Sequence, residues 1–157
     1  MSFIYLASPY GHPDWQERQA RYHKVCRIAG ELMQAGHTVF SPIAHGHSIA
    51  MQLGNDVMDY AFWLRQDFAV LPHCEELWFA QIDGFRESKG MSAEAIAAHA
   101  LGKKLRVWNE SIKAGIRCWE PGQHAFDNAR SDPVAWRVLC EYCAEWGVAD
   151  EKGEPKG

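Results

Sequence analysis

The sequence predicts an α/β fold, a doubly wound parallel sheet with an extra C-terminal helix. Three observations predict it. Short apolar runs of strand length alternate with longer segments in which apolar residues recur every three or four positions. Turn-forming residues such as Pro9, Gly36 and Gly102 separate the two kinds of segment. This regular alternation is typical of parallel sheets that are covered by helices on both faces.

The first unit is a strand, a helix and a second strand. Phe3–Ala7 is a short apolar run ended by Ser8-Pro9, and it predicts a central strand. Asp14-Trp15-Gln16-Glu17 has the pattern of a capping box, and the helix that it opens ends at Gly36. Thr38–Ser41 predicts the second strand. Because a whole helix separates the two strands, we expect them to be parallel.

The following segments continue the alternation. They are a loop or short helix at Ile43–Asn55, a helix at Asp56–Val70 that includes Met58, a strand at Glu76–Ile82, a helix at Met91–Leu101 and a strand at Leu105–Trp108. Strands connected in this way are expected in the order 2-1-3-4. This order opens a crevice at the carboxyl ends of strands 1 and 3.

The alternation stops after Trp108. We therefore divide the chain into an α/β domain over residues 1–108 and a C-terminal extension over residues 109–157. In the extension, Asn109–Asp132 has no regular pattern, Asp132-Pro133 predicts the start of one helix, and residues 148–157 are expected to form a frayed polar tail. The apolar stripe of the helix consists of Trp136, Leu139, Cys143 and Trp146. It exceeds what a four-stranded domain is expected to cover, so we predict a homo-oligomer.

Composition places the chain among ordinary globular proteins. Hydrophobic residues make up 47% of its 157 residues and charged residues 23%, which excludes a disordered chain. The net charge is −4 and no run of Lys and Arg occurs, so duplex nucleic acid is not an expected partner. No apolar run reaches the roughly 20 residues of a membrane span, and no signal peptide precedes the first strand. We therefore expect a cytoplasmic protein without a membrane partner.

Several kinds of chemistry lack their motif. The sequence has no GxxxxGK[ST] or GxGxxG loop and no GxSxG elbow. The five cysteines have no disulfide spacing, and Cys140 and Cys143 lie in a helical pattern without a second pair, so we interpret them as core residues. His45 and His47 with a carboxylate are a conceivable metal site, but two loop histidines at this spacing are weak evidence. We predict neither a cofactor nor a metal.

Polar side chains gather where the predicted strands end. The candidate site residues are Ser8 and Tyr10 after strand 1, His45 after strand 2, Asp67 on the helix before strand 3, and Ser88, Gly90 and Glu94 after strand 3. We expect all of them to line one crevice, because the carboxyl ends of parallel strands lie at the same edge of the sheet. Glu94 falls in the first turn of a helix, where the dipole and free N–H groups suit an anion and keep a carboxylate ionised. Two carboxylates in one crevice suit cleavage of a glycosidic bond.

Each carboxylate also has a purely structural interpretation. Glu94 favours the start of a helix, and Gly90 favours a turn, whatever chemistry they perform. Asp67 is also consistent with a surface carboxylate that forms an ion pair with Arg65 or another nearby basic residue. The residue pattern leaves both interpretations open.

Two motifs resemble a known family. Tyr5-Leu6-Ala7-Ser8-Pro9-Tyr10 resembles the opening motif of the nucleoside 2-deoxyribosyltransferase superfamily, and Asp67, an apolar strand, Gly90 and Glu94 resemble its catalytic pattern. The resemblance covers the chain from Phe3 to Trp108 and implies a flavodoxin- or Rossmann-like domain. It also implies that Glu94 is the nucleophile and that Asp67 assists at the sugar and the base.

The departures from this pattern bear on the substrate. The transferases carry an aspartate and a threonine where this chain has Ser88 and Met91. A serine at this position resembles the 2′-deoxynucleoside 5′-phosphate N-hydrolases of the same superfamily, in which it holds the phosphate. Their glycine- and arginine-rich first loop is replaced here by residues 8–12. The longer loop at residues 83–87, which includes Gly84-Phe85, resembles a bacterial and phage branch of the superfamily.

We therefore expect an N-glycosidase or deoxyribosyltransferase that acts on a nucleoside or a nucleoside 5′-monophosphate, with Glu94 attacking C1′. Ser88, Gly90 and the helix start, flanked by Arg86 and Lys89, form the expected phosphate site. The alternative is a nucleotide-binding sensor module without turnover, in which the long loop and the last helix relay binding to a partner.

Overall fold

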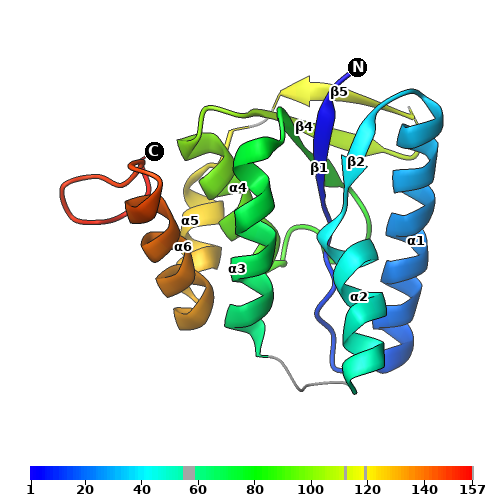
Figure 1. The fold of residues 1–157 in the computed structure, drawn as a ribbon, viewed down its shortest axis with the longest axis horizontal. Coiled ribbons are helices and arrows are strands. Elements are labelled where there is room, and N and C mark those ends of the chain that lie inside the picture. The colour runs from blue at the N-terminus through cyan, green and yellow to red at the C-terminus, as the bar shows by residue number, and fades with distance from the viewer. Residues whose placement is uncertain (55–58, 112, 119, 157) are drawn as a thin grey trace.

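A five-stranded sheet in the order β2-β1-β3-β4-β5 forms the centre of the fold (Figure 1). The structure is a computed structural model that describes residues 1–54, 59–111, 113–118 and 120–156. The parallel strands are β1 (Phe3–Ala7), β2 (Thr38–Phe40), β3 (Glu76–Ala80) and β4 (Lys104–Asn109), and β5 (Ala114–Cys118) pairs antiparallel with β4. The predicted doubly wound sheet and its order 2-1-3-4 are confirmed, and a fifth strand extends its edge.

Helices cover both faces of this sheet. On one side lie α1 (Trp15–Gln34) and α2 (Pro42–Leu53); on the other lie α3 (Tyr60–Val70) and α4 (Lys89–Ala100), against which α5 (Gln123–Arg130) and α6 (Pro133–Glu145) pack (Figure 1). A single 3-10 turn, η1 (Leu71–His73), leads from α3 to β3. Among the described residues, every helix is too short or too polar to cross a bilayer.

Successive strand residues face opposite helical layers. Tyr5, Ala7, Leu77 and Phe79 belong to the core shared with α3, α4 and α6. Ile4, Leu6, Trp78 and Ala80 belong to the core shared with α1. Because both faces of the sheet are buried, the strands are continuous apolar runs rather than alternating ones.

Polar caps fix where the helices begin. Asp14 caps α1 and Asp132 caps α6, as the sequence predicts. Ser41 is not the last residue of β2 but the cap of α2. Pro42 takes the first helical position, to which the fixed φ of proline is suited. The segment predicted as a loop or short helix is therefore helical from Ile43 to Leu53. The predicted start of the next helix, including Met58, lies outside the described residues.

The prediction for the C-terminal extension was incomplete. The segment expected to be irregular contains β5 and α5, so the extension has more than one helix. An antiparallel edge strand that contains Gly115 lacks the apolar run of a central strand. The helix α5 spans only 8 residues, and its buried side chains are the small ones of Ala125 and Ala129.

The last described residues form hydrogen bonds and an ion pair rather than the predicted frayed tail. Asp150 accepts hydrogen bonds from the backbone N–H groups of Lys152 at 2.8 Å and Glu154 at 2.9 Å, and Glu154 pairs with Arg130 at 2.9 Å. In the preceding helix α6, Leu139 and Cys143 are buried within the chain itself. Trp136 is half-buried and Trp146 is exposed, so the chain covers the stripe in part, and the homo-oligomer stays a prediction.

Gly115 tests how tightly β5 packs on the sheet. A Cβ at this position would lie 2.6 Å from ring carbons of Trp78, so we expect Gly115→Ala to destabilise the fold by about 1–3 kcal/mol. Gly30→Ala on α1 is the control, because no atom lies within 4 Å of its added Cβ and the loss of a helical glycine stabilises. Urea unfolding measures both variants. Equal stabilities of the two would contradict the packing.

Candidate active site

A cleft of about 700 Å³ opens at the carboxyl ends of β1 and β3. One face of α2 contributes Ile43, Gly46, His47 and Ala50, and one face of α3 contributes Tyr60, Trp63, Leu64 and Asp67. Both sets have the spacing i, i+3, i+4, i+7, which places their members on one side of a helix. The loop after β1, the start of α1 and the start of α4 complete the walls.

Glu94 lies deep in this cleft. It is only 6% exposed, and its Oε1 accepts a hydrogen bond from the Tyr5 hydroxyl at 2.7 Å. Tyr5 is fully buried in the central strand β1, on the face that α4 covers. The carboxyl group is therefore held in one orientation by a rigid element, which is what a group that must attack a defined atom needs.

The second carboxylate, Asp67, interacts with Glu94 through its charge. Burial raises the pKa of Asp67 to about 7. Burial and the nearby charge of Asp67 raise the pKa of Glu94 to about 8, while the hydrogen bond from Tyr5 opposes the shift. Two coupled carboxyl groups with raised pKa values hold a proton near neutral pH, so one of them is protonated while the other is ionised.

The predicted electrostatics of Glu94 were wrong. The sequence predicted that Glu94 lies in the first turn of its helix, where a carboxylate stays ionised. The helix α4 instead begins at Lys89, with Ser88 as its cap, so Glu94 lies in the second turn. The favourable dipole weakens within the first turn, and burial dominates its pKa.

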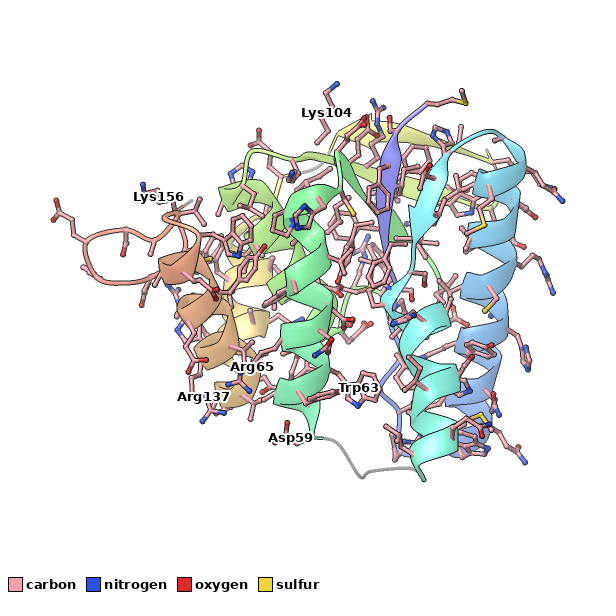
Figure 2. The ribbon with its side chains drawn as sticks, in the orientation of Figure 1. Asp59, Trp63, Arg65, Lys104, Arg137 and Lys156 are labelled. Carbon is pink, nitrogen blue, oxygen red and sulfur yellow. The ribbon has the colours of Figure 1, made fainter. Side chains whose placement is uncertain are left out.

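The structure contradicts the predicted ion pair between Asp67 and Arg65. Arg65 does not pair with Asp67 but with Glu141 of α6, at 3.2 Å. Figure 2 shows Arg65 on the side of α3 that faces α6, whereas Trp63 reaches from α3 towards α2. Asp67 lies on the cleft side of the helix and is not a surface partner of Arg65.

The remaining predicted residues separate into two groups. Ser8, Tyr10, Ser88 and Gly90 line the cleft, and His45 does not: it is exposed, with its ring 5.8 Å from that of Phe40. The Ser8 hydroxyl is buried without a hydrogen-bond partner among the described residues. A Cβ on residue 90 would lie 3.0 Å from the Tyr60 hydroxyl, so a glycine here lets α3 approach the start of α4.

His47 takes the place in the cleft that we expected of His45. Its ring is stacked on Tyr22 at 4.1 Å, and its Nε2 lies 3.0 Å from Gln19 Oε1. Since that oxygen only accepts, Nε2 carries the proton, and Nδ1 accepts from the Tyr10 hydroxyl at 2.7 Å. Burial, followed by the charges of His23 and Arg18, lowers the pKa of His47, so the ring is neutral near pH 7.

Four residues at the cleft were not predicted to belong to the site: Tyr5, His47, Arg18 and Arg21. The Ser41-Pro42 pair was the available signal for His47, because it starts a helix that turns His47 inward and His45 outward. Tyr5 opens the motif that ends at Tyr10, and the alternation of side chains along a strand puts it on the same face of the sheet as Ala7. The expected flanking residue Lys89 lines the cleft, but Arg86 does not. Within the described residues, no three His, Cys, Asp or Glu side chains form a group that could hold a metal ion.

Residues 2–110 match the protein family described as "Domain of unknown function (DUF1937)". The chain belongs to this family. The DUF1937 match spans β1 to β4 and therefore every candidate residue of the cleft except Asp132.

This DUF1937 protein is similar to a solved structure of a 2-deoxyribosyltransferase from the psychrotolerant bacterium Bacillus psychrosaccharolyticus. The sequence identity is 23% over 67% of this chain and 70% of that chain, and the TM-score is 0.46. At this TM-score the likeness carries no information on substrate or mechanism. A comparison with curated proteins found no match.

Proposed function

We propose that this protein cleaves the N-glycosidic bond of a nucleoside or nucleoside 5′-monophosphate, as an N-glycosidase or a deoxyribosyltransferase. The observation that carries the proposal is the pair of carboxyl groups in the cleft, the buried Glu94, which Tyr5 holds at 2.7 Å, and the half-buried Asp67. A nucleophile and an acid in one cleft are what this bond requires.

Each carboxyl group has one role in the proposed reaction. The reacting form of the pair is the one in which Asp67 holds the proton and Glu94 is ionised, which is the less populated form because the pKa of Glu94 is the higher of the two. In this form a Glu94 oxygen attacks C1′, and the bond between C1′ and the base nitrogen breaks. Its electron pair goes to the base, which takes a proton from Asp67. Water, or the nitrogen of a second base, then attacks C1′ of the glycosyl ester, gives its proton to Asp67 and releases Glu94.

The walls of the cleft favour a nucleobase as leaving group. Trp63, Ile43 and Pro42 supply apolar surface on which a flat ring packs. The hydroxyls of Ser8 and Tyr60 supply hydrogen-bonding groups nearby. A mostly apolar pocket with a few polar groups is typical of small-molecule sites.

Incubation with a panel of 2′-deoxynucleosides, ribonucleosides and their 5′-monophosphates tests the proposal. We expect chromatography to detect free base from at least one class, and addition of a second base to reveal transfer. Binding of a nucleotide without release of base would favour the sensor module instead. No release and no binding across the panel would contradict both.

A further inference from the structure

The cleft also has a basic wall. Arg18 and Arg21 lie one turn apart on α1 and both line the cleft, whereas Glu94 and Asp67 belong to helices on the other side of the sheet (Figure 1). Among the described residues, neither arginine forms an ion pair with a carboxylate, although Glu87 and Asp132 also line the cleft.

Both guanidinium groups contain a buried donor that lacks an acceptor. The Nε atoms of Arg18 and Arg21 are buried without a hydrogen-bond partner in the described part of the chain. Arg18 lies over the Trp15 ring at 5.1 Å, and Arg21 donates through Nη1 to the Gly11 carbonyl at 2.8 Å. A desolvated cationic donor without an acceptor destabilises a protein, so an anionic ligand at this wall would stabilise it.

The loop before α4 is shaped around Arg21. Gly84 has a φ of +86°, in the left-handed region that favours glycine, and a Cβ there would lie 2.5 Å from Nη2 of Arg21. The same guanidinium contacts Gly11 in the loop after β1. The absence of a side chain at Gly84 thus makes room for Arg21, and the carbonyl of Gly11 holds the same guanidinium at the cleft.

We propose that Arg18 and Arg21 bind the phosphate group of a nucleotide ligand, at the α1 wall of the cleft rather than at the start of α4. The planar fork of a guanidinium matches the oxygens of a phosphate, and two forks complement its two charges. A phosphate bound there lies on the α1 side of the cleft, whereas Asp67 and Glu94 lie on the side formed by α3 and α4. The proposal rests on the proposed function for the identity of the rest of the ligand.

Calorimetric titration with 2′-deoxynucleosides, their 5′-monophosphates and inorganic phosphate tests this site. It is done with the wild-type chain and, to exclude turnover, with the Glu94→Gln chain. We expect a monophosphate to bind about 10- to 100-fold more tightly than its nucleoside, with an advantage that shrinks in high salt. Arg18→Gln and Arg21→Gln should each remove about tenfold of that advantage, and Gly84→Ala should act like Arg21→Gln.

Arg27→Gln is the matched control, because Arg27 is exposed on the same helix and does not line the cleft. It should leave every affinity unchanged. Melting curves check folding, and Arg21→Lys replaces Arg21→Gln if the latter does not fold. Equal affinities for nucleoside and monophosphate, or no binding of any probe, would overturn the site.

A preference for phosphate that survives both arginine changes but is lost in Ser88→Asp would place the phosphate at the start of α4 and also overturn the proposal. Arginine-dependent binding without release of base would leave this site standing and reject the glycosidase alone.

Discussion

Replacing Glu94 by glutamine should lower the rate of base release by about 10³-fold or more, because the amide keeps the shape of the side chain but cannot attack C1′. The Tyr5 hydroxyl still has an oxygen to which it donates, so the cleft keeps its geometry. We therefore expect nucleotide affinity to change little while turnover collapses. Single-turnover assays separate these two quantities.

Glu145→Gln is the control for this change, since Glu145 is exposed at the end of α6, away from the cleft. It should be as active as the wild type. Intact-mass measurement on rapidly quenched wild-type protein should detect a glycosyl adduct that Glu94→Gln lacks. If Glu94→Gln retains more than about a tenth of the wild-type rate, the nucleophile is another group.

The same carboxyl groups should make the fold less stable as the pH rises. Burial raises the pKa of Asp67 to about 7, and burial with the charge of Asp67 raises that of Glu94 to about 8, whereas both are near 4 in an unfolded chain. Between about pH 4 and pH 8 the folded chain therefore binds more protons than the unfolded chain. The free energy of unfolding falls through this range, by several kcal/mol in total, and levels off above it.

Urea unfolding at about pH 5 and about pH 9 measures this effect. We expect the wild type to be markedly less stable at the higher pH. Glu94→Gln should reduce the difference, and the double variant with Asp67→Asn should remove most of it, because neither amide has to bury a charge. Glu94→Gln thus gains stability at high pH while it loses activity, a combination that misfolding cannot produce. An unchanged pH dependence in the double variant would contradict the burial of the pair.

The position of the site could be predicted from the sequence, but the protonation of its central residue could not. The order of the strands followed from apolar runs and turns, and it directed Asp67 and Glu94 to one edge of the sheet. The pKa of Glu94 is raised by burial and by the charge of Asp67, and the hydrogen bond from Tyr5 opposes this shift. Asp67 and Tyr5 lie far from Glu94 in the sequence and meet it only in the folded chain.

Small errors in where a helix begins had large consequences for which side chains reach the cleft. Successive side chains of a helix point about 100° apart around its axis. Placing Ser41 in a strand instead of at a helix cap led us to His45, while the helix from Pro42 presents His47. Starting α4 at Met91 rather than Lys89 likewise put Glu94 in the wrong turn.

By itself the sequence determined the doubly wound sheet, the helix caps at Asp14 and Asp132, and the two carboxylates, because local patterns of apolar and capping residues encode them. Only the tertiary structure decided that β5 and α5 form, that Arg65 pairs with Glu141 rather than Asp67, and that Arg18 and Arg21 line the cleft. The physical reason is that these features depend on contacts between distant segments. Desolvation, ion pairing and unpartnered donors exist only once the chain has folded around them.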